Sequence, residues 1–376
     1  MIYLDNAATT QLNKDVHETI NKLRSSYFMN ANSPYWPAIQ ISDLQEKSRA
    51  ILAEMLNVNK KELFFLSTGS EGNNTAIKGI AFKFYGKGTK HIITSETEHS
   101  SVYETCKQLE RNFGFEVTYL KPNKHGRISN TDILEAIKDN TILITIMKVN
   151  SEMGTMNYVE EIYDQIKKIN RNIVVHMDCV QAFGKYELDL KHMDMASFSA
   201  HKINGVKGSA LFYKKENITI LPLISGGEQE MGLRAGTANY HFNIALAKTL
   251  KLFLEKKESS PIKPKYDLMI QLLQSDSRIV INSDLQNTSM YIINFSIPEY
   301  KSEVILNDLE HKDIYISTKS ACSSNAKRSR VMESLPVDDS IKESAFRVSF
   351  SLYTTIEDIQ TFYKELIATL DSITKG

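Results

Sequence analysis

The sequence predicts an α/β protein whose large domain holds a mostly parallel sheet and whose C-terminal part is a smaller α+β unit. The chain has 376 residues. Because a single hydrophobic core stops growing at roughly 250–300 residues, two domains are expected. Between about residues 60 and 250, short apolar runs alternate with stretches of helical periodicity, as in strand–helix–strand units. The segment 256–265, KKESSPIKPK, is charged and contains two prolines, so it predicts a domain boundary.

Short apolar runs predict the strands of the large domain. They cover residues 62–67, 90–96, 141–149, 172–180, 195–200 and 209–213. The segments between them have helical patterns; in residues 157–169, for example, Val159, Ile162, Ile166 and Ile169 recur on one helix face. In parallel sheets, ligands bind beyond the carboxyl ends of the strands. Polar residues that directly follow these strands are therefore candidates for a site.

The C-terminal domain is predicted to contain strands at 289–297, 314–321 and 345–354, followed by a terminal helix. One face of that helix carries apolar residues: Ile359, Phe362, Tyr363, Leu366 and Leu370. Thr354 and Glu357 have the spacing of a capping box at its start. We therefore divide the chain into a segment 1–15 that packs with the small domain, a large domain 16–255 and a small domain 256–376.

The bulk composition excludes several classes of partner. Lys+Arg and Asp+Glu number 45 each, so there is no electrostatic reason to expect nucleic acid or an anionic membrane as a partner. The N-terminus lacks the features of a signal peptide, and no apolar run reaches the ~20 residues that cross a bilayer. Three scattered cysteines do not support a disulfide framework or a zinc site. A cytoplasmic protein without a metal is the simplest expectation.

The stretch SFSAHK, residues 197–202, places an amine at the end of a predicted core strand. Lys202 is a candidate nucleophile, because burial against apolar neighbours lowers the pKa of an amine. The alternative is a lysine that only extends its ammonium group into water at a strand end. The residues around Lys202 do not decide between the two.

The stretch STGSEGNNTAIKGIAFKFYGKG, residues 67–88, follows a predicted strand and opens a helix. Such a helix start presents free backbone N–H groups to an anion, and Ser70 adds a hydroxyl. The stretch lacks the GK[ST] ending of a Walker loop, and no G-x-G-x-x-G fingerprint occurs in the chain. Capping alone also explains a helix that begins with Ser and Gly.

The stretch HMDCVQAFGK, residues 176–185, contains a carboxylate near the end of an apolar strand. Asp178 shares a strand face with His176, whereas Cys179 faces the other way. A carboxylate there needs a cation, and a protonated pyridine nitrogen is one such cation. Gln181 could donate a hydrogen bond to the same ligand. Capping of the following turn by Asp178 is the alternative.

Together, these three stretches supply what pyridoxal 5'-phosphate requires. The phosphate needs N–H groups and hydroxyls, the pyridinium needs an acid, and the aldehyde needs an amine. We therefore predict pyridoxal phosphate as the cofactor, with Lys202 as the amine that bonds it.

Long blocks of the chain then resemble the cysteine desulfurases (NifS-like, group I) of the class V aminotransferase family, over essentially the whole length. The blocks include YLDNAATT (3–10), SETEHSSV (95–102), KVNSEMGT (148–155), GGEQEMGLRAGT (226–237), STKSACSS (317–324) and AFRVSFS (345–351). The resemblance implies fold type I of the pyridoxal-phosphate enzymes. It also implies a homodimer, since Thr237 matches the threonine that reaches the phosphate of the partner subunit.

The resemblance assigns the remaining cofactor contacts residue by residue. His99 matches the histidine that stacks on the ring and shuttles protons, and Asp178 matches the partner of the pyridine nitrogen. Asn150 and Gln181 match the residues that approach the ring hydroxyl, and Lys202 matches the amine that bonds the aldehyde. The positions that match phosphate contacts are Gly69, Ser70, Ser199, Ala200 and His201.

Two C-terminal blocks separate a desulfurase from a plain aminotransferase. Cys322 matches the nucleophile that accepts sulfur, and its polar, cationic surroundings suit an exposed thiolate. The alternative is a half-buried structural thiol. Arg347 matches the residue that, with Asn150, binds the substrate, and a guanidinium suits its carboxylate.

The resemblance implies that L-cysteine gives L-alanine and a persulfide on Cys322. The alternatives are a selenocysteine lyase, a cysteine C–S lyase or an aminotransferase on the same cofactor, or a non-catalytic relative. The chain ends soon after its terminal helix, at SITKG. We therefore expect a desulfurase that passes sulfur to one acceptor protein, such as a tRNA-thiolation or cofactor-thiolation enzyme, rather than to an iron–sulfur scaffold.

Overall fold

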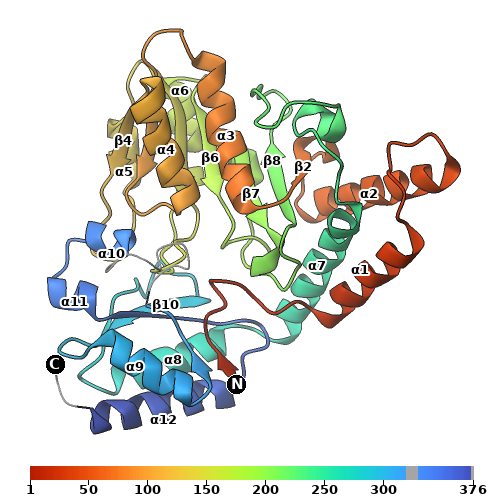
Figure 1. Cartoon of the computed structure of the whole chain (residues 1–376). Coiled ribbons are helices and arrows are strands. Elements are labelled where there is room, and N and C mark those ends of the chain that lie inside the picture. The colour runs from red at the N-terminus through yellow and green to blue at the C-terminus, as the bar shows by residue number, and fades with distance from the viewer. Residues whose placement is uncertain (319–328, 374–376) are drawn as a thin grey trace.

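A seven-stranded sheet forms the centre of the large part of the protein, shown in Figure 1 as a computed structural model that describes residues 1–318 and 329–373. The strand order is β2 (Leu63–Leu66), β8 (Ala210–Lys214), β7 (Met195–Ser199), β6 (Val174–Asp178), β5 (Thr141–Met147), β3 (His91–Ser95) and β4 (Glu116–Leu120). Only β8 runs antiparallel to its neighbours, so the predicted mostly parallel α/β sheet is confirmed.

Helices cover both faces of this sheet, as a parallel sheet requires. On one face, α3 (Gly69–Phe84) and α4 (Ser100–Phe113) pack their apolar residues against the strands. On the other face lie α2 (Trp36–Met55), α5 (Asn130–Glu135), α6 (Tyr163–Ile169) and α7 (Tyr240–Ser259). Helix α1 (Lys14–Ser26) packs on α7. The strands β3, β5, β6 and β7 are consequently buried along their whole length.

The smaller part of the protein is built on an antiparallel sheet in which β10 (Ile292–Ser296) lies between β12 (Ala345–Ser349) and β9 (Val280–Ile281). The helices α8 (Lys263–Gln274), α9 (Ser302–His311) and α12 (Ile356–Ser372) share one apolar cluster with this sheet. Two short helices, α10 (Arg330–Ser334) and α11 (Asp339–Glu343), complete it.

The N-terminal residues join the smaller part. Strand β1 (Ile2–Tyr3) pairs in parallel with β11 (Ile314–Tyr315), and Leu4 is buried in the apolar cluster of that part. Apart from this contact, the division into segments 1–15, 16–255 and 256–376 is still a prediction. The boundary drawn at residue 255 falls inside α7, and the helix breaks only at residues 260–262, next to Pro261.

Local predictions differ from the structure in a few places. The capping box of α12 is formed one residue later than predicted, by Thr355 and Asp358, because the Thr354 hydroxyl accepts a bond from the backbone N–H of Ser351 instead. The edge strand β4 was not predicted; most of its residues are only half-buried, so its apolar pattern is weak. Residues 157–169 form the short 3-10 turn Val159–Ile162 before α6 rather than one helix.

No helix within the described ranges combines the length and the apolar composition needed to span a bilayer. The same residues contain no group of three or more His, Cys, Asp or Glu side chains placed to hold a metal ion.

Candidate active site

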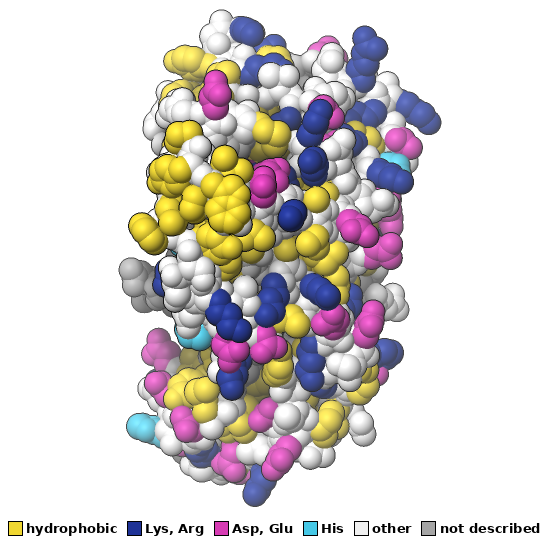
Figure 2. Space-filling model, turned by 90° about the vertical axis from the view of Figure 1, so that its right-hand side faces the viewer, with side chains coloured by type: hydrophobic (Ala, Val, Ile, Leu, Met, Phe, Trp, Pro, Cys, Tyr) yellow, Lys and Arg dark blue, Asp and Glu magenta, His cyan; other side chains and the backbone are white. Residues whose placement is uncertain are grey.

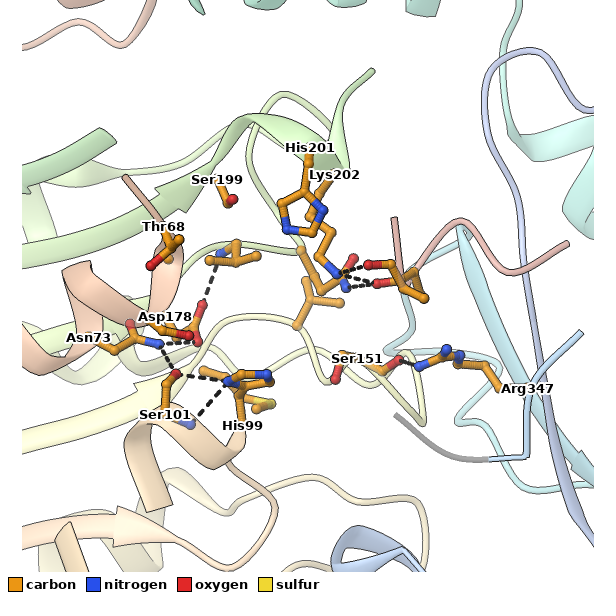
Figure 3. A pocket seen from close by; sticks show the side chains of 18 residues that line it. Thr68, Asn73, His99, Ser101, Ser151, Asp178, Ser199, His201, Lys202 and Arg347 are labelled. Carbon is orange, nitrogen blue, oxygen red and sulfur yellow. Dashed lines mark hydrogen bonds between the residues drawn. The ribbon is translucent and has the colours of Figure 1, made fainter. Parts of the chain in front are cut away.

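A pocket lies at the carboxyl ends of β5, β6 and β7, and Ala7 and Ala8 of the N-terminal segment and Arg347 of β12 complete its lining (Figure 3). Nine of the residues predicted from the sequence line it: Gly69, Ser70, His99, Asp178, Gln181, Ser199, His201, Lys202 and Arg347. The pocket therefore collects side chains from segments that are far apart in the sequence.

Lys202 lies in the single 3-10 turn Ala200–Lys202 that directly follows β7. Its ammonium group donates to the carbonyl oxygens of Ala7 (2.6 Å) and Ala8 (2.7 Å). The same turn is fixed to the N-terminal segment because the hydroxyl and the N–H of Thr10 both donate to the His201 carbonyl (2.8 and 2.9 Å). The amine is thus held at the pocket by backbone atoms near the N-terminus.

His201 is neutral at physiological pH. Burial, followed by the charge of Lys202, lowers its pKa to about 3. Its Nδ1 atom lies 3.1 Å from the Thr9 hydroxyl. The ring can therefore serve the pocket as a hydrogen-bonding group but not as a cation.

Asp178, at the end of β6, is buried and faces two donors. Its Oδ2 accepts from the side-chain amide of Asn73 (2.7 Å), and its Oδ1 accepts from the backbone N–H of Val180 (3.0 Å). The second bond is the turn-capping contact considered as an alternative for this residue. It coexists with a position on the pocket wall, so Asp178 can both cap the turn and face a ligand.

His99 caps the N-terminus of α4 with its ring. The backbone N–H of Ser101 donates to Nδ1 (3.1 Å), and the Ser101 hydroxyl lies 2.8 Å from the same atom. Because Nδ1 accepts, the proton of the neutral ring is on Nε2. Asn73 donates to the Ser101 hydroxyl (2.9 Å) as well as to Asp178, so one chain of hydrogen bonds links Asp178 to His99 (Figure 3).

The start of α3 lies directly against the strand ends. A Cβ atom on Gly69 would approach Val180 Cγ2 to 2.6 Å, and one on Gly72 would approach the Ser197 hydroxyl to 2.9 Å, so only glycine fits this close packing. The Thr68 hydroxyl caps the helix by accepting from the N–H of Glu71 (3.0 Å). The N–H groups of Gly69 and Ser70 belong to the first turn and have no partner within the helix. Both residues line the pocket, and the start of a helix suits an anion.

Arg347 reaches the pocket from β12 of the smaller part. It donates to the carbonyl of Ser151 (2.9 Å) and to the Asp5 carboxylate (2.6 Å). Within the described residues its Nε atom is buried without a hydrogen-bond partner. A buried, unpaired donor is costly, which is consistent with a ligand carboxylate that arrives here.

Three predicted residues do not line this pocket. The Asn150 amide holds its own turn, by donating to the Thr97 carbonyl and accepting from the N–H groups of Glu152 and Met153. Ala200 is buried in the main apolar cluster. Thr237 is exposed and away from the pocket of its own chain. Cys322 lies outside the described residues.

Several residues of the pocket were not predicted: Ala7, Ala8, Thr68, Asn73, Ser101, Met147, Val149, Ser151 and Val180. Asn73 follows Gly69 by four residues, so helix periodicity could have placed it beside a predicted residue. Ser101 follows His99 by only two residues, a spacing that gives no such signal. The carbonyl groups of Ala7 and Ala8 carry no signal in a sequence.

Comparison with known proteins identifies the family. The model of the family "Aminotransferase class-V" matches residues 2–362. The chain belongs to the class V aminotransferase family. It is 38% identical to the NifS/IcsS protein homolog of Lactobacillus delbrueckii subsp. bulgaricus, over 99% of this chain and 97% of that one. It is 36% identical to the cysteine desulfurase IscS of Dictyoglomus turgidum, over 95% of this chain and 91% of that one.

Solved structures of similar proteins have the same fold. A NifS-like protein superposes with a TM-score of 0.90 at 31% identity, covering 99% of this chain and 100% of that chain. The structure of SspA in complex with cysteine superposes with a TM-score of 0.84 at 32% identity, covering 94% and 100%. The predicted resemblance and fold type are thereby confirmed.

Class V aminotransferases are pyridoxal-phosphate enzymes, and the pocket fits this cofactor. It offers an amine, a buried carboxylate, an imidazole and unpaired N–H groups at a helix start. In addition, Asn73 lines the pocket and donates to Asp178, and its Oδ1 atom is buried without a donor among the described residues. Such an orphaned acceptor agrees with a polar ligand in the space.

Glu98, next to His99, is a fully buried carboxyl group behind the pocket. Its Oε1 accepts from the Ser95 hydroxyl (2.7 Å) and the Met147 N–H (3.0 Å), while Oε2 has no partner within the described residues. Burial raises its pKa from 4.5 to about 8. Glu98 is therefore protonated at neutral pH, and its neutral form is the one that the fold favours.

This pKa predicts how stability depends on pH. The folded chain binds the Glu98 proton more tightly than the unfolded chain does, so the contribution of Glu98 is fully present below pH 4.5 and is lost as the pH rises to about 8. Glu98→Gln keeps the acceptor but cannot ionise. When the pH is raised from 5 to 8, the melting temperature of the Glu98→Gln variant should fall less than that of the wild type.

The measurement is thermal unfolding at both pH values, with Glu96→Gln, at a half-buried position two residues away, as the control. The control should follow the wild type. An equal fall in all three proteins would contradict the assignment of a protonated Glu98.

Proposed function

We propose that the protein is a cysteine desulfurase, which converts L-cysteine to L-alanine and keeps the sulfur as a persulfide on Cys322. The observation that carries the proposal is the convergence of Lys202, Asp178, His99 and Arg347 on one pocket. The similarity to proteins named cysteine desulfurase, and to SspA in complex with cysteine, supports this choice among pyridoxal-phosphate enzymes.

Each pocket residue has a task toward the cofactor. Asp178 would face the pyridine nitrogen, and His99 would stack on the ring. The start of α3, with Ser199 and His201, would hold the phosphate, and Lys202 would bond the aldehyde. When bound, pyridoxal phosphate supplies an electron sink that stabilises the charge left on the substrate α-carbon after its proton leaves.

The chain's own residues would carry out the proton and sulfur transfers. Arg347 binds the substrate carboxylate, the free Lys202 amine takes the α-proton, and His99 manages the thiol proton. The Cys322 thiolate attacks the substrate sulfur, so that an S–S bond forms while the C–S bond breaks. The electron pair of the broken C–S bond stays with the substrate. A proton then adds to the β-carbon and another returns to the α-carbon, which gives alanine.

Replacement of Cys322 tests this mechanism against the alternatives. In Cys322→Ser, the release of alanine and sulfide from cysteine in the presence of a thiol reductant should fall at least about 100-fold, because the nucleophile is lost. Mass spectrometry of the wild type after incubation with cysteine should find added sulfur on Cys322.

Cys179→Ala is the matched control, since Cys179 is fully buried and should leave activity largely intact. Undiminished sulfide release in Cys322→Ser would contradict a persulfide mechanism and favour a C–S lyase, a selenocysteine lyase or an aminotransferase on the same cofactor.

We further propose a homodimer in which Thr237 contacts the phosphate in the partner's site. Its exposure outside the pocket of its own chain supports this role. The face that carries α1 and α2 gathers hydrophobic side chains in its upper half (Figure 2). Phe28, between α1 and α2, Trp36, at the start of α2, and Met231 are 83%, 68% and 56% exposed, and exposed apolar surface of this kind marks interaction sites.

Trp36→Glu should therefore weaken the dimer. Sedimentation at micromolar concentration should give twice the mass of one chain for the wild type and a shift toward one chain for the variant. Tyr85→Glu, which changes an exposed aromatic at the end of α3, is the control and should stay dimeric. A wild type with the mass of one chain would overturn both the dimer and the role of Thr237.

We propose that the acceptor of the sulfur is a protein, and we predict that this protein is a tRNA-thiolation enzyme. Tight binding to an iron–sulfur scaffold protein, measured by calorimetry, would count against that choice. Cytoplasmic location also stays a prediction.

A further inference from the structure

A second buried amine lies behind the pocket. Lys185, in the turn that follows β6, is only 5% exposed, and its Nζ donates to Gln181 Oε1 (3.0 Å). It also lies 5.3 Å from the centre of the Tyr291 ring. Within the described residues, no carboxylate comes within ion-pair distance of it, whereas buried Lys148 pairs with Glu160. A buried amine without a counter-ion is costly, which suggests a function.

Lys185 connects to Lys202 through two groups. The Gln181 amide accepts from Lys185 with Oε1 and donates with Nε2 to the Ala7 carbonyl (2.9 Å). That same carbonyl accepts from Lys202 (2.6 Å). Because a carbonyl only accepts, the Gln181 NH2 group must face the Ala7 carbonyl, which leaves Oε1 for Lys185. Its NH2 group is held on the side of the pocket, which Gln181 lines.

The two amines also act on each other through their charges. Burial, and then the charge of Lys202, lowers the pKa of Lys185 to about 7. The repulsion is mutual, so a charged Lys185 disfavours a charged Lys202. Among the described titratable groups, His201, which both amines help to keep neutral, and the phenol of Tyr291, whose pKa is raised by burial, lie near this pair. Asp178, His99 and Arg347 line the same pocket as Lys202.

We propose that Lys185 is a positioning residue, which holds the NH2 group of Gln181 toward the pocket and favours the neutral, nucleophilic form of the Lys202 amine. A like-charged neighbour is a known way to activate a lysine. This role rests on the proposed function of Lys202 as the amine that bonds the cofactor.

The first test uses Lys185→Met, which keeps the length and apolar stem but removes the charge and the donor. The visible absorption of the bound cofactor titrates as a proton leaves the nitrogen that joins it to Lys202. Without the charge of Lys185, the midpoint of this titration should rise by about one pH unit. The dissociation constant of pyridoxal phosphate, titrated into the cofactor-free protein, should rise roughly ten-fold.

Lys265→Met is the matched control. Lys265 is also a buried lysine that donates to neutral oxygens, those of Leu352 and Ser260, but it lies in α8 of the smaller part. Its replacement should leave the midpoint and the dissociation constant at the wild-type values.

Two further proteins show whether Lys185 acts through Gln181. In Gln181→Glu, a carboxylate pairs with Lys185 and neutralises it in place, so the midpoint should again rise. In the double variant Lys185→Met/Gln181→Leu, the loss of cofactor affinity should be close to that of Gln181→Leu alone, because both changes remove one interaction.

Wild-type midpoints in both Lys185→Met and Gln181→Glu would overturn the role of Lys185, as would multiplicative losses of affinity in the double variant. These outcomes leave the proposed function intact, provided that the wild type shows the visible band. If the wild type shows no such band with added cofactor, the function of Lys202 fails, and the role of Lys185 fails with it.

Discussion

The contact between the Lys202 ammonium group and the carbonyl oxygens of Ala7 and Ala8 is the constraint on which the pocket depends. The N-terminal segment is itself tied to β12, since Ala7 N–H donates to the Ser349 hydroxyl (2.8 Å) and Ser349 N–H donates to the Leu4 carbonyl (2.7 Å). One extended segment therefore fixes the strand that carries Arg347 to the turn that carries Lys202. This segment thereby fixes the distance between Arg347, the proposed carboxylate-binding residue, and Lys202, the proposed cofactor-binding residue.

Burial then decides the charges around this contact. His201 and the fully buried His176 have pKa values of about 3, and Glu98 has a pKa of about 8, so all three are neutral near pH 7. The neutral surroundings leave the charged groups of the pocket largely unscreened, and their mutual effects are stronger than they would be in water. The buried amine of Lys185 shows the effect, because burial and the charge of Lys202 lower its pKa to about 7.

The sequence predicted the parts of the site that follow strands. Asp178, Ser199, His201 and Lys202 could be located because β6 and β7 are short, apolar and buried, and because ligand sites lie at carboxyl ends of parallel strands. It did not predict Asn73 and Ser101, since their importance arises from contacts between α3, α4 and β6. The family resemblance assigned Asn150 to the cofactor and the substrate; its amide also holds its own turn, and the predicted role is still a prediction. Backbone acceptors such as Ala7 cannot be recognised from residue types.

The central claim is that Lys202 is the amine that bonds the cofactor. Reduction of the pyridoxal-phosphate-loaded protein with borohydride, followed by peptide mapping with mass spectrometry, tests it most directly. Our account predicts a pyridoxyl group on the peptide that contains Lys202 and on no other. A modified Lys185, which is the neighbouring buried amine, or a protein without any modified lysine would contradict it.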